Sequence, residues 1–291
     1  MATLKELKSK QTKFESANSL MNTTKTMAIT GKEKANSNLR AFGPYAQGMS
    51  NVIGNIVRDG DGSNNHFLQE RDVKKSLIIV ISSDKGICGG FNKGVIKAAE
   101  EKTADPEAAP HDVITVGRKA SDFFEKNQAT NVVAMYPGKT TDMYADATMI
   151  GGTAVEMFTT GQVDEVSIAY NTQQSSVGMP RVRRLLPVVA GDFAGNETTT
   201  ATDGYNSFHQ FEPDLDTVAN YAVPQYVNSS IYGAMLESAV GENASRAVAA
   251  DGAAKKAGEK AEEYKLAFNR ARQAKITTEI TEIVAGAEAL R

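Results

Sequence analysis

The most constraining feature of this sequence is its last part, from about residue 213 to residue 290, which has a helical composition nearly throughout. A helix of roughly 75 residues, rising 1.5 Å per residue, would be about 110 Å long. A compact domain built from a chain of this length is much narrower than that. The sequence therefore predicts a long helix with a smaller domain attached, and not a single globule.

Pro224 is difficult to place in this helix, because proline in a helix interior costs about 3 kcal/mol. Two alternatives remain open: the helix begins at Pro224, with the proline in its first turn, or it continues through the proline with a kink. Gly241, Gly252 and Gly258 each weaken the helix by up to about 1 kcal/mol relative to alanine.

In the final turns, apolar residues recur as in a heptad seam: Ile276, Ile280, Ile283, Ala287 and Leu290.

The first part of the chain, residues 3–57, has few helix breakers before Gly43 and Pro44. It contains a stripe of residues at alternating steps of three and four, which predicts one buried face of a helix. Polar residues interrupt the stripe at three of its eight positions. The stripe consists of Leu4, Leu7, Gln11, Phe14, Asn18, Met21, Lys25 and Ala28.

The middle of the chain alternates short β-branched runs with helical stretches, a pattern typical of βαβ units around a largely parallel sheet. The predicted strands are 76–82, 112–118, 131–136 and 166–171, and 181–189 could add one more. The predicted division is an N-terminal shaft helix (1–58), a linker (59–75), an α/β domain (76–190), a second linker (191–212) and a C-terminal shaft helix (213–291).

Composition argues against several kinds of partner. Lys plus Arg number 32 and Asp plus Glu 35, so a formal net charge of −3 provides no basic excess for nucleic acid or an anionic membrane surface. The longest aliphatic run, 77–81, is far shorter than the roughly 20 residues of a membrane span. The three histidines lie far apart and lack metal-ligand spacing.

The segment "LIIVISSDKGICGGFNKGVIKAAE" (77–100) has the layout of a phosphate-binding loop, with a strand, a glycine-rich turn and a helix. In a P-loop, a lysine and a Ser or Thr follow the second glycine. Here Gly89 and Gly94 have the right spacing, but Val95 and Ile96 occupy those two positions. A structural role is favoured over a nucleotide site: the glycines allow a tight strand-to-helix turn with positive φ.

Two other groups of residues have both a chemical and a structural interpretation. Cys88, the single cysteine, could be a nucleophile at a helix N-terminus, but a small packing residue is favoured because no histidine is nearby in sequence. Glu279 and Glu282 lie on one helix face, and their spacing would allow the two carboxylates to act together in acid–base catalysis. The favoured interpretation is that both carboxylates lie on a solvated helix face opposite the isoleucine seam. The sequence predicts no catalytic, cofactor-binding or metal-ligating residue.

Taken together, three segments resemble the gamma subunit of the rotary F-type ATP synthase. The loop "SSDKGICGGFN" (82–92) is similar to the family signature S-[DT]-[KR]-G-L-C-G-G-[LF]-N. The C-terminal "FNRARQAKITTEITEIVAGAEAL" (268–290) matches a second signature almost position by position. The N-terminal "LKELKSKQTKF" (4–14) and "RAFGPYAQGM" (40–49) align without gaps. The resemblance covers essentially the whole chain.

The resemblance implies a fold and a mechanical function. The fold class would be α/β plus long helices, with the terminal helices forming an antiparallel coiled coil and a Rossmann-like α/β domain inserted between them. The coil would be the rotor shaft that couples proton-driven rotation of the membrane c ring to ATP synthesis at the beta subunits. Implied partners are the alpha and beta subunits, the epsilon- or delta-type stalk subunit and the c ring, with no nucleic acid and only an indirect membrane contact.

The resemblance also implies residues that contact the beta-subunit ring. These are Arg272, Gln273, Thr277 and Glu279 near the C-terminus, and Asp84 and Lys85 in the glycine-rich loop. The implied location is peripheral, on the matrix side of the mitochondrial inner membrane or the cytoplasmic side of a bacterial plasma membrane.

This sequence also departs from the family pattern. "SLMNTTKTMA" (19–28) stands where the family reads KIT-x-AM-x-MVA, and 241–260 matches only through Glu242, Ala244 and Arg246. Two other hypotheses remain: an independent nucleotide- or phosphate-binding enzyme built on the middle domain, and a generic coiled-coil scaffold with an inserted domain.

Overall fold

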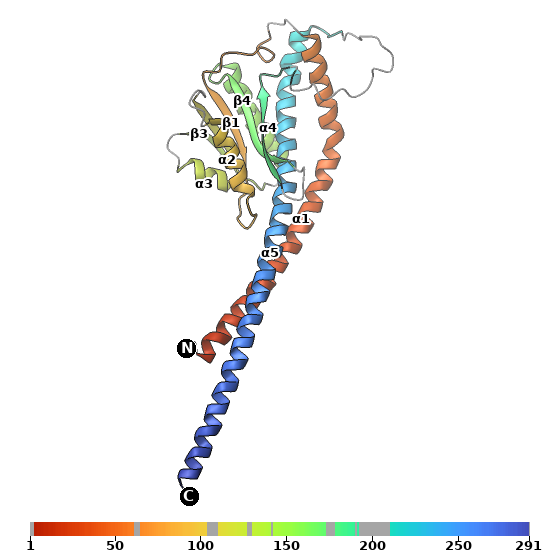
Figure 1. Ribbon diagram of the computed structural model, residues 1–291. Helices are drawn as coiled ribbons and strands as arrows, with labels where there is room; N and C mark the ends of the chain where they lie inside the picture. The colour runs from red at the N-terminus through yellow and green to blue at the C-terminus, as the bar shows by residue number, and fades with distance from the viewer. Residues whose placement is uncertain are drawn as a thin grey trace. The chain divides into compact units, whose positions relative to one another are not determined.

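The computed structural model describes residues 3–60, 65–103, 110–126, 130–140, 142–172, 178–189, 191 and 210–290. Long helices at both ends of the chain flank an α/β segment, which confirms the predicted fold class (Figure 1). The elements are α1 (Leu4–Asp59), β1 (Ser76–Ile81), α2 (Phe91–Thr103), β2 (His111–Val116), α3 (Arg118–Phe124), β3 (Asn131–Tyr136), α4 (Met143–Thr159), β4 (Glu165–Thr172), β5 (Met179–Leu186) and α5 (Leu215–Ala289).

The chain forms two compact units, which we describe separately. The first comprises Met1–Ile29 and Arg246–Arg291, and the second comprises Thr30–Ser245. Each long helix contributes to both units. The five-segment division predicted from the sequence follows the helices instead of these units, and it stays a prediction. Most of the second predicted linker, 191–212, lies outside the described residues.

In the first unit, the start of α1 pairs with the C-terminal part of α5. Phe14 stacks on Tyr264 with ring centroids 5.5 Å apart, and Lys25 Nζ lies 2.8 Å from Asp251 Oδ1. Residue numbers fall along α5 as they rise along α1, so the two helices are antiparallel. The predicted stripe from Leu4 to Ala28 is confirmed, because each of its positions is buried or half-buried.

The polar residues of the stripe are accommodated by specific neighbours. Gln11 is buried, and its Nε2 donates to Glu15 Oε1 over 2.8 Å. Asn18 lies against Gly258, where an added Cβ would be only 2.7 Å from Asn18 Nδ2. Gly258 therefore weakens the helix locally but leaves room for the asparagine on the facing helix.

Asp251 predicts a pH dependence for this unit. Hydrogen bonds from Lys25 and then from Lys255 lower the pKa of Asp251 to about 2. A depressed pKa stabilises the fold at a pH above the unfolded value, and this stabilisation is lost as the pH falls toward the folded value. Between about pH 4 and about pH 2 we expect the protection of amides around Lys25 and Asp251, relative to their intrinsic exchange rates, to fall, because the ionised carboxylate is lost.

Mass-spectrometric hydrogen exchange on the wild type and on Asp251→Asn checks this expectation. The asparagine variant lacks the titrating group and should show a smaller change over the same pH window. An equal change in both proteins would mean that other carboxylates cause it.

The second unit contains a five-stranded sheet in the order β3-β2-β1-β4-β5. β1 pairs in parallel with β2 and β4, β2 pairs in parallel with β3, and β5 is antiparallel to β4. The strand that the sequence suggested at 181–189 is present as β5. Its place at the sheet edge suits Pro180, because proline has no backbone N–H to donate to a ladder.

Both faces of the sheet are covered. On one face, Leu77, Ile79 and Ile81 of β1 pack with residues of α4 and with the parts of α1 and α5 that belong to this unit. On the other face, Ile78 and Val80 pack with residues of α2 and α3. β1 is buried along its whole length, which explains its continuous apolar sequence.

Helix α5 begins at Leu215, so the alternative in which it begins at Pro224 is wrong. Asp214 caps the helix: its Oδ1 accepts the backbone N–H of Thr217 over 2.8 Å.

The helix continues through Pro224. Val223 and Val227, on either side of the proline, are fully buried. Burial of each such side chain stabilises by about 1.5–3 kcal/mol, which offsets a proline cost of about 3 kcal/mol.

Gly117, between β2 and α3, gives a prediction about stability. Its φ is +92°, and an added Cβ would lie 2.3 Å from the carbonyl oxygen of Ser82. We expect Gly117→Ala to lower the free energy of unfolding by about 2–3 kcal/mol, because both the backbone conformation and the space require glycine. Urea unfolding followed by circular dichroism measures this.

Gly152→Ala in α4 is the control. No heavy atom lies within 4 Å of the added Cβ there, so alanine should raise stability by up to about 1 kcal/mol. A small effect at both positions would contradict the close approach of Gly117 to Ser82.

Candidate functional site

The strand order places a topological switch point between β1 and β4. The chain leaves β1 toward β2 and later reaches β4 on the other side of β1. In open α/β sheets, ligands bind in the crevice outside the carboxyl ends of the strands at such a point. The glycine-rich loop from Ser82 to Gly90 follows β1 at this edge, so the layout that suggested a phosphate loop is present.

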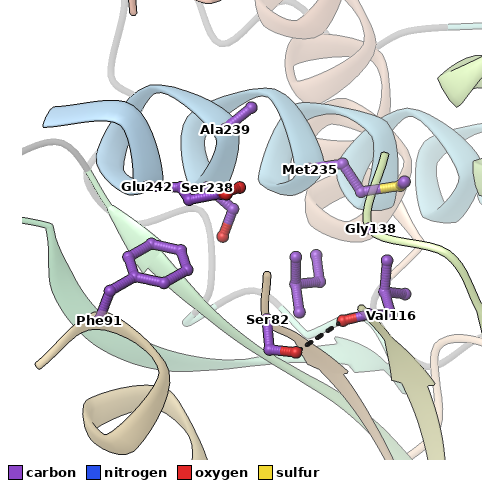
Figure 2. Close-up of a pocket in the computed structure, with 9 residues that line it drawn as sticks. Ser82, Phe91, Val116, Gly138, Met235, Ser238, Ala239 and Glu242 are labelled. Atoms are coloured by element: carbon purple, nitrogen blue, oxygen red, sulfur yellow. Dashed lines mark hydrogen bonds between the residues drawn. The ribbon is translucent and has the colours of Figure 1, made fainter. Parts of the chain in front are cut away.

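Helix α5 occupies this crevice (Figure 2). Ile81, Ser82, Phe91, Val116 and Gly138 approach a segment of α5, and only about 10 Å³ remains between them. The α5 residues that line this space are Met235, Ser238, Ala239 and Glu242. Small-molecule pockets have volumes of about 300–1,000 Å³, whereas 10 Å³ is about the space of one water. The chain therefore fills the usual nucleotide position with its own helix.

Side-chain hydrogen bonds hold the start of the loop. Asn92 Oδ1 accepts the backbone N–H of Ser83 over 2.9 Å, and Asn92 Nδ2 donates to Ser83 Oγ over 2.9 Å. Asn92 Nδ2 also lies 3.1 Å from Cys88 Sγ. Cys88 is buried, as expected for the packing residue that the sequence favoured.

Asp84 ties the loop to the ends of two neighbouring strands. Its Oδ1 accepts the backbone N–H groups of Arg118 and Gly138 at 3.0 Å each, and its Oδ2 accepts that of Lys139 at 2.9 Å. Partial burial by itself raises the pKa of Asp84. The three N–H donors and the positive charge of Arg118 together lower this pKa by more than burial raises it, so the net shift is downward. The carboxylate thus connects the segments that follow β1, β2 and β3.

Lys85 is exposed beside an open depression of about 460 Å³ at the same edge of the sheet. The depression is lined by Asp84, Lys85, Arg118, Ser121, Met135, Tyr136 and Pro137. The two loop residues predicted to contact a partner therefore border one surface. Because the carboxylate of Asp84 already accepts three internal hydrogen bonds, a partner contact at Asp84 would add to an existing structural role.

The glycines of the loop only partly meet the sequence-based expectation. Gly89 has φ +58°, as predicted. Gly86 and Gly90 do not have positive φ, and an added Cβ at either would meet open space. The other left-handed residue is Ile87, with φ +59°. The turn therefore depends on the hydrogen bonds of Ser83, Asp84 and Asn92 as well as on glycine.

The C-terminal candidates lie on the part of α5 that α1 does not cover. Near the start of α1, Lys8 Nζ lies 5.7 Å from the ring centroid of Phe268, and Ala271 of α5 is still half-buried. Every described residue from Arg272 to Leu290 is exposed. The heptad seam predicted in the final turns is thus unpaired among the described residues, because α1 begins at Leu4.

Arg272, Gln273, Thr277 and Glu279 are all exposed on this end of α5. Thr277 Oγ1 donates to the backbone carbonyl of Gln273 over 3.0 Å. Glu279 forms an ion pair with Lys275 over 3.6 Å. Such an exposed pair contributes little to stability, so it would yield readily to a stronger partner contact.

Sequence analysis missed several residues that build the strand-edge surface. Ser82 Oγ lies 3.2 Å from the carbonyl oxygen of Val116, a contact drawn in Figure 2, and it accepts the backbone N–H of Ala120. Gly117 and Gly138 allow the loops to approach. The available pattern was a serine or glycine within two positions after each of β1, β2 and β3, because parallel strands end at a common edge.

Similar solved structures define the class. A chain of the Euglena gracilis mitochondrial ATP synthase has a TM-score of 0.68 at 18% identity, covering 99% of this chain and 94% of that one. A chain from a Tetrahymena thermophila mitochondrial ATP synthase structure of the central stalk and c ring has a TM-score of 0.59 at 21% identity, covering 80% and 99%. The chain thus shares its fold, two long terminal helices with an inserted α/β sheet, with chains of ATP synthase structures, one of which is a structure of the central stalk and c ring.

Sequence comparison identifies the particular family. The family model described as ATP synthase matches residues 3–290. The ATP synthase gamma chain of Geobacter metallireducens is 31% identical over 295 residues, covering 100% of both chains. That of Chlorobium phaeobacteroides is 34% identical over 303 residues, covering 100% of this chain and 99% of the relative. The chain belongs to the ATP synthase gamma chain family, the noncatalytic central-stalk subunit of the F-type enzyme.

The ATP synthase is a membrane-associated complex, and the gamma chain is associated with the membrane only indirectly. Within the described residues, none of the helices combines the length and the apolar character needed to cross a bilayer.

The hydrogen bonds of Asp84 lead to a prediction. We expect Asp84→Ala to lower the free energy of unfolding by about 1–3 kcal/mol, because three backbone N–H groups lose their acceptor. Since the pKa of Asp84 is lowered in the fold, its stabilisation is present at neutral pH and is lost as the pH falls below the unfolded value. Urea unfolding at neutral and acid pH measures both effects.

Asp122→Ala is the matched control, since Asp122 is an exposed carboxylate on neighbouring α3. It should change stability by less than about 0.5 kcal/mol. Equal effects of the two substitutions would argue against a structural role for Asp84.

Proposed function

We propose that this chain is the rotor shaft that couples proton-driven rotation of the c ring to ATP synthesis at the beta subunits. The observation that carries this proposal is the end of α5 beyond Arg272, a helix with an apolar seam that the described part of the chain leaves exposed. Ile276, Ile280 and Ile283 are 47%, 56% and 71% exposed. An exposed apolar stripe of this kind favours a partner surface.

The coupling is mechanical in this proposal. A shaft with different side chains around its circumference makes different contacts with each beta subunit at any one angle. A contact shifts the conformational equilibrium of a catalytic site only through its different affinity for the states of that site. Rotation changes which beta subunit receives which contact, so each site passes through binding, synthesis and release.

We assign the contacts with the beta-subunit ring to Arg272, Gln273, Thr277 and Glu279 on α5. The planar guanidinium of Arg272 can donate two parallel hydrogen bonds to a carboxylate, which makes its contact directional. Its exposure leaves it accessible for this role. In the second unit, we assign Asp84 and Lys85 to the same ring, with Lys85 as the exposed contact.

The other proposed partners are the alpha subunits, the epsilon- or delta-type stalk subunit and the c ring. One similar solved structure contains a central stalk with a c ring, and another contains F1 with a c ring. The proposed location is on the matrix side of a mitochondrial inner membrane or the cytoplasmic side of a bacterial plasma membrane.

Reconstitution tests the function as a whole. The alpha–beta ring is assembled with and without this chain, and its ATPase rate is measured; with the remaining subunits in vesicles, ATP-driven proton pumping is measured as well. We expect the chain to change the ATPase rate and to be required for pumping. Identical behaviour of the ring with and without the chain would sink the proposal.

The C-terminal contacts give a finer prediction. We expect Arg272→Ala and Gln273→Ala each to lower coupled proton pumping by roughly fivefold to tenfold, because each removes a contact that biases the beta subunits. The thermal stability of the isolated chain should not change, since both side chains are exposed. Pumping in vesicles and thermal unfolding are the two measurements.

Arg270→Ala is the control, because Arg270 is also exposed on α5 and is outside the proposed contact set. It should pump as the wild type does. Unchanged pumping in both contact variants would remove Arg272 and Gln273 from the proposed surface.

A further inference from the structure

Residues 65–71, which we call the strap, follow α1 and connect three elements of the second unit. Asn65 Nδ2 donates to Asn220 Oδ1 of α5 over 3.0 Å. The backbone carbonyl of Phe67 accepts the N–H of Val188, just after β5, over 2.8 Å. The buried ring of Phe67 stacks on Phe158 of α4 with ring centroids 6.1 Å apart. The strap is therefore held against α5, α4 and the end of β5 by specific contacts.

His66 lies inside this strap with one ring nitrogen buried. Its ring packs on Phe67 with centroids 4.0 Å apart. Among the described residues, its buried Nε2 has no hydrogen-bond partner. A neutral imidazole carries a hydrogen on one nitrogen only, whereas a charged imidazolium donates from both. A proton on His66 would therefore leave a charged N–H buried without an acceptor, which costs more than a neutral unpaired group.

Arg71 opposes a positive charge on His66. Its guanidinium lies 4.7 Å from the ring centroid of Phe158, and its Nη2 donates to the backbone carbonyl of His66 over 3.4 Å. The burial of the imidazole and then the charge of Arg71 lower the pKa of His66 below its ordinary value of 6.5. The closed strap accordingly favours the neutral imidazole.

Other charged groups lie on the elements around the strap. They are Arg58 and Asp59 at the end of α1, Glu70 in the strap, Glu156 of α4, Arg184 of β5, and Asp214 and Asp216 at the start of α5. Arg58 pairs with Asp59 over 3.1 Å. Arg184 pairs with Glu70 over 3.0 Å. None of these carboxylates is a hydrogen-bond partner of His66 Nε2, so the closed strap offers no acceptor for an imidazolium at that nitrogen.

We propose that His66 makes the closure of the strap sensitive to acid: the strap is closed while the imidazole is neutral and opens when the imidazole binds a proton. Opening gives the imidazolium access to water and separates it from Arg71. This regulation concerns the chain itself and goes beyond the proposed rotor function, on which it does not depend.

The direction of the pH dependence follows from the sign of the shift. The pKa of His66 is lower in the closed strap than in an open, solvated one. Protons therefore bind preferentially to the open strap. The closed strap has its full stability above about pH 6.5 and loses it as the pH falls below that value. This is the range in which histidine changes its charge in physiological conditions.

Hydrogen exchange of the full-length chain, measured by mass spectrometry at pH 7.5 and pH 5.5, tests the proposal. The reporters are the amides of Phe67, Leu68 and Val188, because the first two donate to Asn65 and the third donates to Phe67. We expect their protection, relative to intrinsic exchange rates, to fall by roughly fivefold at the lower pH. Circular dichroism at both pH values checks that the chain as a whole stays folded.

His66→Gln removes the titrating group and should keep the same protection at both pH values. His66→Asn is a second neutral replacement and should behave alike. His111→Gln is the matched control, because His111 is also half-buried and burial lowers its pKa as well. It should retain the wild-type response of the strap.

Three results would overturn the proposal. The first is unchanged protection of the wild-type strap between the two pH values. The second is a loss of protection in the two His66 variants that equals the loss in the wild type, since another group would then be titrating. The third is disappearance of the response in His111→Gln, which would make His111 the sensor. None of these results bears on the proposed rotor function.

Discussion

The burial of the N-terminal part of α5 against the sheet is the contact on which the second unit depends. Val223, Val227 and Ile231 are fully buried in the core that this helix shares with β1 and α4. The same packing keeps the helix continuous at Pro224. Farther along α5, Met235 and Ser238 close the crevice at the switch point of the sheet. One helix thus completes the core and occupies the position where a doubly wound sheet would otherwise hold a ligand.

The first unit has the opposite character, because its helices leave much of their surface to solvent. The stripe of α1 contains Gln11, Asn18 and Lys25, and each has a specific neighbour: Glu15, Gly258 or Asp251. Polar positions in a coiled coil reduce stability but restrict the register. From Arg272 on, every described residue of α5 is exposed, and the helix continues with an apolar seam. A helix of this kind is suited to a surrounding partner, in agreement with the family of the chain.

Much of the fold follows from local patterns in the sequence. The stripe from Leu4 to Ala28 identified the buried face of α1 because helical periodicity does not depend on distant residues. The strands were found because β-branched runs and turns alternate regularly. The sequence left the start of α5 open: Pro224 suggested one possible boundary, whereas the cap at Asp214 and the buried residues around the proline decide for the earlier start at Leu215. A tertiary contact can outweigh a local cost of about 3 kcal/mol, and the sequence does not show that contact directly.

For the candidate site, the sequence by itself determined which segments matter, since the loop at 82–92 and the helix end at 268–290 carry the family signatures. It also determined that the loop lacks the lysine and the Ser or Thr of a phosphate loop. Only the tertiary structure decided what the loop residues do. Asp84 accepts N–H groups from Arg118, Gly138 and Lys139, which are separated from it by more than thirty positions in the chain. Parallel strands bring such distant residues to one edge, and hydrogen-bond geometry depends on that proximity and not on sequence spacing.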